Sequence, residues 1–266
     1  MIVKKTAFGI KTTCIIIAIC ACVSILLSVL FGGWWETLLL SVGVNLLSAI
    51  IIIVSVNAKV EKQSKEIAEE KEKESECRMI AGANKVINCI LPFYITEFNQ
   101  LTIPIDKRIV NSYLTVPRGS QFNESFTVND LRDMFFNDLA LYGNKTNCIL
   151  ETYDEYEKKL VSAFERMLTI CSFSHFPALE NTIENILSMS YRSTTAELLS
   201  FLNQSGQSYV DRIKMMISDY SGNPDEDYQN NKYISNEFFD VLNLYHHLKR
   251  MKSAIEAYCD EIQKVQ

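Results

Sequence analysis

The only local group of basic side chains in the sequence lies near its C-terminus. It consists of His246, His247, Lys249, Arg250 and Lys252. Clustered basic side chains can bind phosphate, so one interpretation is an anion site for a nucleotide signal or a nucleic-acid end. The alternative is the solvated face of an amphipathic helix, because apolar residues recur at helical spacing through the same segment. The sequence favours the solvated face and leaves both interpretations open.

A second set of polar residues interrupts a long apolar run. Ser41, Asn45, Ser48 and Ser55 recur at spacings that place them on one face of a helix. In the preceding apolar run, small residues form a matching stripe: Cys14, Ala18, Ala21 and Ser28. Close helix packing is one interpretation, because small residues let backbones approach and Asn can bond across helices. In the other, Asn45 lines a polar contact or water path that forms when several hairpins assemble.

No pattern in the sequence indicates an enzyme. Asp225, Glu226 and Asp227 lack the spaced oxygens and final Glu of an EF-hand, so we expect a solvated turn there. The eight cysteines are scattered and include no C-x-x-C pair, which argues against a zinc site. Nucleophile-elbow, phosphate-loop, metalloprotease and dinucleotide motifs are absent, as is the Arg–His spacing of all-helical ribonucleases. We expect no catalytic site, cofactor or metal.

The composition favours an all-α protein associated with a membrane. Hydrophobic residues make up 48% of the 266 residues, with only 9 Gly and 5 Pro, which argues against a many-turned all-β chain. The net charge of −6 argues against generic binding to nucleic acid or anionic lipid as the main function, because both need a basic surface. We therefore expect an all-α protein whose partner is a lipid bilayer.

Two uncharged apolar runs, residues 12–31 and 37–56, predict a transmembrane hairpin over residues 1–58. Each run has about 20 residues, enough at about 1.5 Å per residue to cross a hydrocarbon core of about 30 Å. The join carries Trp34 and Trp35, aromatics of the type that anchor at headgroup level. A cleaved signal peptide is the alternative for the first run.

The basic residues around the two runs predict their orientation. Lysines lie before the first run and after the second: Lys4, Lys5, Lys11, Lys59, Lys62 and Lys65. Glu36 is the only charged residue in the join. The positive-inside rule therefore places both termini in the cytoplasm.

Residues 59–76 predict a charged helical stalk, and residues 77–266 a cytoplasmic helical bundle. The stalk lacks Gly and Pro and places Glu61 and Lys65 at the favourable i,i+4 spacing. The bundle is large enough to bury its own core. Its first helix is expected to be kinked at Pro92 and to be followed by an irregular stretch over residues 102–126.

Five amphipathic helices are predicted in the rest of the bundle. The first covers residues 128–142, with Thr127 and Asp130 as its cap. The next begins at Thr152, with Glu155 completing a capping box. A third runs from Pro177 to beyond Phe201, and a shorter one covers 209–220. The last has the most regular apolar stripe: Phe238, Val241, Leu242, Tyr245, Leu248, Met251, Ile255, Tyr258 and Ile262.

This arrangement of hairpin, charged stalk and helical domain without catalytic motifs resembles the small two-span membrane effectors of bacterial anti-phage defence systems. The resemblance covers the architecture and carries no site residue. It implies a homo-oligomer in the bacterial inner membrane that is controlled by a regulatory protein or by a nucleotide or nucleic-acid signal. The expected outcome is membrane permeabilisation and abortive infection. The alternative is a membrane-anchored adaptor or scaffold whose bundle binds proteins without pore activity.

Overall fold

The structure is a computed structural model that describes residues 2–30, 33–107, 121–136, 148–193, 195–230 and 235–265. In these ranges the chain is helical, and the only extended feature is an isolated bridge at Cys148. The chain divides into two compact units, Met1–Lys73 and Glu74–Gln266. The expected all-α class is thus confirmed for the described residues.

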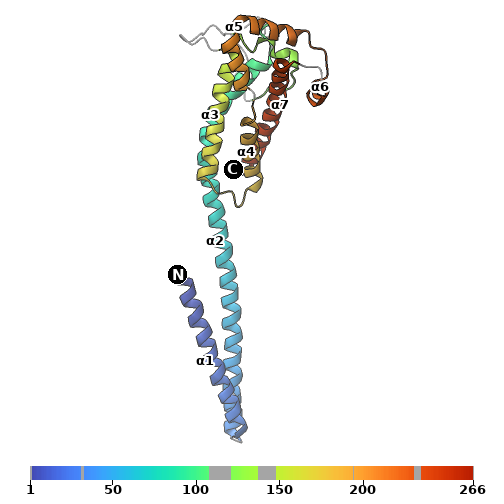
Figure 1. Ribbon diagram of the computed structural model, residues 1–266. Helices are drawn as coiled ribbons and strands as arrows, with labels where there is room; N and C mark the ends of the chain where they lie inside the picture. Colours follow the sequence, from blue (N-terminus) through green and yellow to red (C-terminus); the bar gives the residue numbers. More distant parts are fainter. Residues whose placement is uncertain are drawn as a thin grey trace. The chain divides into compact units, whose positions relative to one another are not determined.

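The first unit contains two long apolar helices that lie side by side (Figure 1). Helix α1 spans Ile2–Leu30 and α2 begins at Trp34. Gly33, just before α2, has a φ of 80°, a conformation that glycine adopts without the clash of a Cβ. Both helices contain stretches long and apolar enough to cross a membrane, with most of these residues exposed to the surroundings. The expectation of two long apolar N-terminal helices is confirmed.

Helix α2 does not end where its apolar run ends, and it continues as one helix to Thr102. Its residues 59–75 are exposed, and the predicted pair of Glu61 and Lys65 forms with Oε1 and Nζ 3.1 Å apart. The helix also runs through Pro92, so the separate first bundle helix expected from the sequence is the last part of α2. The second apolar run, the stalk and the first bundle helix were predicted as three separate pieces. They form one helix because the residues at the two junctions between them are helix formers and include no Gly or Pro.

The second unit packs the end of α2 with five further α-helices around an apolar core (Figure 1). The additional helices are α3 (Ile149–Ile170), α4 (Pro177–Ser190), α5 (Thr195–Ser218), α6 (Pro224–Asn230) and α7 (Asn236–Gln263), with short 3-10 turns η1 (Ile105–Lys107) and η2 (Val128–Asp133). Helix α7 packs on α4 and α5, and α3 packs on α4. Tyr258 joins three helices: its hydroxyl donates to Asn84 Oδ1 on α2 at 2.8 Å, and its ring meets Phe164 on α3 edge to face.

Helix α7 matches its prediction closely. Every residue of the apolar stripe predicted between Phe238 and Ile262 is buried. Ser235 is the N-cap, and its hydroxyl accepts a hydrogen bond from the backbone N–H of Phe238. The prediction holds because apolar residues that repeat at helical spacing over the whole segment define a single apolar face, and that face must be buried.

Two predicted helix starts are corrected by the structure. The segment after Thr127 forms only the 3-10 turn η2, although Asp130 caps it by accepting from the Thr127 backbone N–H and hydroxyl. Residues 137–147 of that prediction, with Leu139 and Tyr142, lie outside the described residues. Helix α3 begins at Ile149, not at Thr152, because Glu151 accepts from the Cys148 backbone N–H and closes a cap there.

The remaining corrections concern helix ends without strong sequence signals. The predicted helix from Pro177 is divided into α4 and α5, and α5 includes the segment predicted as a separate short helix. No Gly or Pro marks this break, where the hydroxyls of Ser193 and Thr195 hydrogen-bond to each other. The acidic triplet Asp225, Glu226 and Asp227 forms the first turn of α6 instead of an irregular loop, with Pro224 at the first helical position.

Candidate functional site

Small residues bring α1 and α2 together along one seam of the first unit. A Cβ on Gly43 would lie 2.5 Å from Ile25 Cγ1 and 3.2 Å from the Ala21 carbonyl oxygen, so only glycine fits there. Ala21 and Ser28 are buried, and Cys14 and Ala18 are half-buried. The small-residue stripe of the first span therefore faces α2. On α2, the less exposed residues recur with the alternating spacing of a packed seam: Leu39, Gly43, Leu46, Ile50, Ile53 and Asn57.

The polar stripe of α2 lies on a different face of the helix. Ser41, Asn45, Ser48 and Ser55 are all exposed and take no part in the α1–α2 seam. The Ser48 hydroxyl donates to the Val44 carbonyl of its own helix at 3.0 Å, which satisfies it internally. Among the described residues, the Asn45 amide has no hydrogen-bond partner. Packing of α1 on α2 within one hairpin therefore does not account for the stripe.

The two tryptophans stand at the start of α2, beside the turn. Trp34 and Trp35 are 68% and 55% exposed, and their rings meet edge to face with centroids 4.8 Å apart. Exposed indole rings at the end of an apolar helix suit the headgroup region of a bilayer, where the N–H can stay hydrated.

The structure divides the predicted basic group of α7 among three environments. His246 and His247 are buried at 8% exposure each. Lys252 is mostly covered, whereas Lys249 and Arg250 are exposed. Only these last two side chains match the solvated face that the sequence favoured, and the five residues do not converge on one anion-binding surface.

Each covered member of the basic group already has a partner. His246 Nε2 lies 3.2 Å from the Pro224 carbonyl oxygen, and His247 Nε2 lies 2.9 Å from Glu157 Oε1. The Lys252 ammonium donates to the backbone carbonyls of Asn123 and Glu124 at 2.9 and 3.0 Å. These groups hold α6, α3 and the 121–126 segment against α7.

Sequence reasoning missed a buried polar network centred on Glu157 of α3. Its Oε1 accepts from His247 of α7 and from the Ser190 hydroxyl of α4, at 2.9 and 2.8 Å. Its Oε2 is buried without a partner among the described residues. Burial raises the pKa of Glu157, but the hydrogen bond and positive charge of His247 and the Ser190 hydroxyl leave that pKa below its ordinary value. A glutamate on the apolar face of α3 was the only sequence signal for this network.

The hydroxyls of two buried tyrosines lie beside this network. Tyr94 of α2 and Tyr153 of α3 place their oxygens 2.9 Å apart. Burial and the nearby carboxylate of Glu157 raise the pKa of both phenols well above the usual value, so they stay neutral. The hydrogen bonds of Glu157 thus join α7 and α4 to α3, and the contact between the hydroxyls of Tyr94 and Tyr153 joins α2 to α3.

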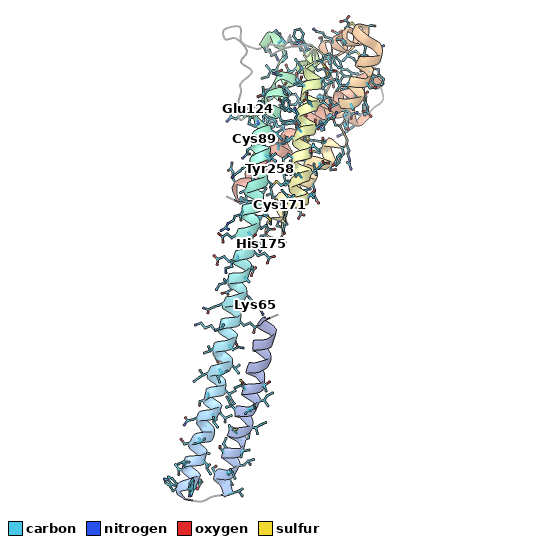
Figure 2. All side chains as sticks on the ribbon, turned by 90° about the vertical axis from the view of Figure 1, so that its left-hand side faces the viewer. Lys65, Cys89, Glu124, Cys171, His175 and Tyr258 are labelled. Carbon is cyan, nitrogen blue, oxygen red and sulfur yellow. The ribbon has the colours of Figure 1, made fainter. Side chains whose placement is uncertain are left out.

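A second buried carboxylate was also missed. Glu76 of α2 is 2% exposed, and its Oε2 lies 2.5 Å from His175 Nδ1 in the α3–α4 connection (Figure 2). Burial raises the pKa of Glu76, but hydrogen bonds from His175, Ser172 and Ser174 leave it below the ordinary value. All three histidines of the chain thus lie beside carboxylates, since His246 Nδ1 is 3.7 Å from Asp225.

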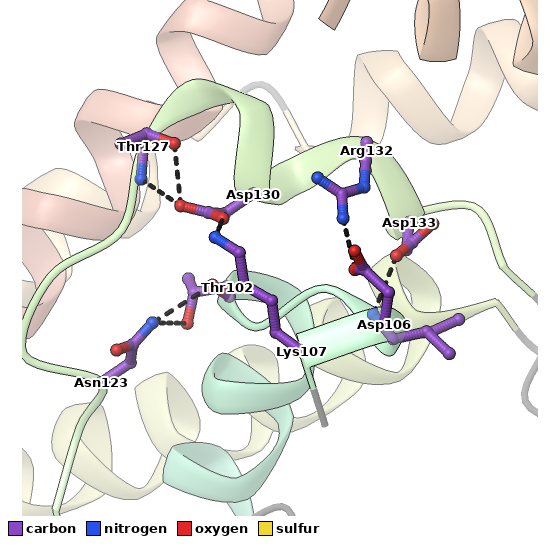
Figure 3. Close-up of polar contacts among 9 residues, drawn as sticks. Thr102, Asp106, Lys107, Asn123, Thr127, Asp130, Arg132 and Asp133 are labelled. Carbon is purple, nitrogen blue, oxygen red and sulfur yellow. Dashed lines mark hydrogen bonds and ion pairs between the residues drawn. The ribbon is translucent and has the colours of Figure 1, made fainter. Parts of the chain in front are cut away.

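A group of polar contacts fixes the segments on either side of residues 108–120 (Figure 3). Lys107 Nζ lies 2.5 Å from Asp130 Oδ1, Arg132 pairs with Asp106, and the Ile105 backbone N–H donates to Asp133. Beside them, the Asn123 amide donates to the carbonyl and hydroxyl of Thr102 at 3.1 and 3.3 Å. These contacts join η1 and the end of α2 to η2 and the 121–126 segment.

The second unit also has an open cleft of about 610 Å³ between α2, the 121–124 segment and the end of α7. It is lined by Asn88, Leu91, Pro92, Ile95, Gln121, Phe122, Glu124, Lys252, Glu256, Cys259, Asp260 and Gln263. Apolar side chains such as Leu91, Ile95 and Phe122 line it together with the carboxylates of Glu124, Glu256 and Asp260. In the described part of the chain, no group of three or more His, Cys, Asp or Glu side chains could hold a metal ion.

Comparisons with known proteins identify no similar family, protein or structure. No protein-family model, curated protein or solved structure matches the chain.

Proposed function

We propose that this protein is a membrane-anchored effector whose hairpins assemble through the polar face of α2 and permeabilise a bacterial inner membrane. The C-terminal unit would face the cytoplasm, where the lysines on both sides of the hairpin hold it. It would receive a signal from a regulatory protein, a nucleotide or a nucleic acid. Abortive infection is the proposed biological outcome.

The observation that carries this proposal is the exposed Asn45 amide. In hydrocarbon, a polar group without a hydrogen-bond partner costs several kcal/mol. Among the described residues, α1 offers Asn45 no partner because it packs on another face of α2. A second hairpin or enclosed water can supply the missing bond, and an interhelical bond of this kind contributes about 0.6–2 kcal/mol.

Assembly also provides the switch that the proposal requires. Two helices alone cannot enclose a conduction path, so a pore needs several hairpins with their polar faces turned inward. The serines beside Asn45 would line such a path without adding charge. The protein would then be silent as a monomer and active as an oligomer.

A substitution at Asn45 tests the proposal. The full chain is induced to a high level in bacteria, and the membrane potential is followed with a potential-sensitive dye. We expect depolarisation by the natural sequence and its loss with Asn45→Leu. Leu47→Ala is the matched control and should retain activity, because Leu47 is an exposed residue of α2 outside the polar face. An unchanged potential with the natural sequence even when the full defence locus is triggered by phage, or full depolarisation by Asn45→Leu, would refute the effector function.

The cleft in the second unit favours one alternative, a membrane-anchored adaptor. A cleft lined by both apolar and polar side chains suits the binding of a partner segment, and the exposed residues 59–75 of α2 would act as a spacer. An adaptor would leave the membrane potential unchanged even when its signal is present. The dye experiment, repeated with phage triggering the full defence locus, therefore separates the two functions.

A further inference from the structure

Helix α2 carries an exposed apolar stripe within the second unit. The stripe consists of Met79, Gly82, Val86, Cys89 and Phe93, and we call it the α2 stripe. Met79, Val86 and Phe93 are 44%, 46% and 56% exposed, and nothing lies within 4 Å of a Cβ placed on Gly82. Cys89 is exposed as well and is labelled on α2 in Figure 2.

The α2 stripe is distinct from the face with which α2 enters the core. That core face includes Ile80, Ile87 and Tyr94, which are fully buried. The stripe follows the alternating three- and four-residue spacing of a coiled-coil seam, with Met79, Val86 and Phe93 one heptad apart. Folding of the second unit therefore leaves a second apolar seam on α2 largely exposed, although the Phe93 ring at its end stacks on Tyr156 of α3 with the ring centroids 5.7 Å apart.

We propose that the α2 stripe packs against the same stripe of a second copy of the chain, with the two α2 helices parallel. This inference rests on the proposed membrane anchoring. Two chains with the same topology in one membrane hold their α2 helices in the same direction. Identical residues then meet across a two-fold axis, and Gly82 permits close approach of the backbones.

The charges beside the seam favour the parallel arrangement. Arg78 and Lys85 flank one side of the α2 stripe, and Ala83 and Ile90 flank the other. In parallel packing, the basic flank of one copy faces the uncharged flank of its partner. Antiparallel packing would place the basic flanks against each other, where like charges repel.

The size of the stripe indicates a membrane-bound copy as its occupant. The stripe extends over about 21 Å of helix. Its five residues are far fewer than the roughly 20–30 residues that each partner contributes to a stable interface between soluble proteins. Anchoring two chains in one bilayer raises their effective concentration and lets a small seam be occupied. A freely diffusing partner would not gain this advantage.

Cys89 provides a native reporter of this contact. We expect mild oxidation of membranes that contain the full chain to give a dimer in which mass spectrometry finds two Cys89 peptides joined by a disulfide. Val86→Glu should reduce that product at least tenfold, because it places a charge in the seam. Val86 is nearly half exposed, so the thermal stability of this variant should match that of the natural sequence.

A neighbouring position supplies the control. Asn88→Cys in a Cys89→Ser background places an exposed thiol on α2 outside the seam and should give little cross-linked dimer. Absence of the Cys89 product, or equal cross-linking by the Asn88→Cys chain, would overturn the parallel packing. Depolarisation that depends on Asn45 would persist in that case, so failure of this inference is distinguishable from failure of the proposed function.

Discussion

Replacing Glu157 with leucine should destabilise the second unit strongly. The side chain is 4% exposed, and its Oε1 accepts from both His247 and Ser190. Glu157→Leu would leave these two donors without their acceptor in a dry core. Breaking a buried pair by removal of one partner costs about 3–5 kcal/mol, a large fraction of the roughly 5–15 kcal/mol that stabilises a domain.

The double substitution gives the sharper test. In Glu157→Leu with His247→Leu, the unpaired imidazole is gone and apolar side chains fill the site, so the loss should be smaller than the sum of the two single losses by about 2 kcal/mol or more. Only the Ser190 hydroxyl then lacks its partner. A matched exposed control is Glu155→Gln on the same helix, which breaks the pair with Lys159 and should cost less than about 1 kcal/mol.

The assay is urea denaturation of the full chain in detergent, followed by far-ultraviolet circular dichroism. The apolar helices of the first unit should remain helical in the micelle, so the urea-sensitive signal reports the second unit. Strict additivity of the two single losses, or a loss below about 1 kcal/mol for Glu157→Leu, would refute the buried-pair reasoning.

Three further predictions concern pH, a loop contact and the hairpin. The folded-state pKa of Glu76 lies below its usual 4.5, so its contribution to stability should be complete above pH 4.5 and be lost as the pH falls through the lowered pKa. Glu76→Gln should therefore make the melting temperature less dependent on pH in the acid range. Lys252→Met should speed amide hydrogen exchange at residues 121–126, since two carbonyls there lose their donor, and unchanged exchange would contradict this. Gly43→Val should open the α1–α2 seam and slow migration in detergent gels, whereas Ser41→Ala on the exposed face should migrate normally.

The sequence predicted the elements whose pattern is long and regular. Helix α7 repeats its apolar positions over more than twenty residues. The two N-terminal helices contain uncharged apolar runs long enough to cross a membrane, which is a pattern typical of helices. Shorter elements were placed less accurately. The start of α3 depends on a cap formed by Glu151 and the Cys148 backbone, and the capping pattern at Thr152 is equally good as a sequence.

The buried ion pairs could not be predicted because they join distant parts of the chain. Glu157 and His247 are 90 residues apart, and Glu76 and His175 are 99 residues apart. In the sequence, His247 belongs to a basic group next to lysines, and only the packing of α7 against other helices places its side chain in the core. Periodicity assigns a residue to a face of its helix and carries no information about which helix covers that face.

The sequence by itself determined that Ser41, Asn45, Ser48 and Ser55 share one face of a helix, because helical spacing is a local property of the backbone. Only the tertiary structure decided that α1 packs elsewhere on α2, through Gly43, and leaves this polar face exposed. The physical reason is that the contact depends on the fit between two surfaces. Gly43 admits Ala21 and Ile25 of α1 and so selects the seam, which leaves the polar face outside the contact between α1 and α2.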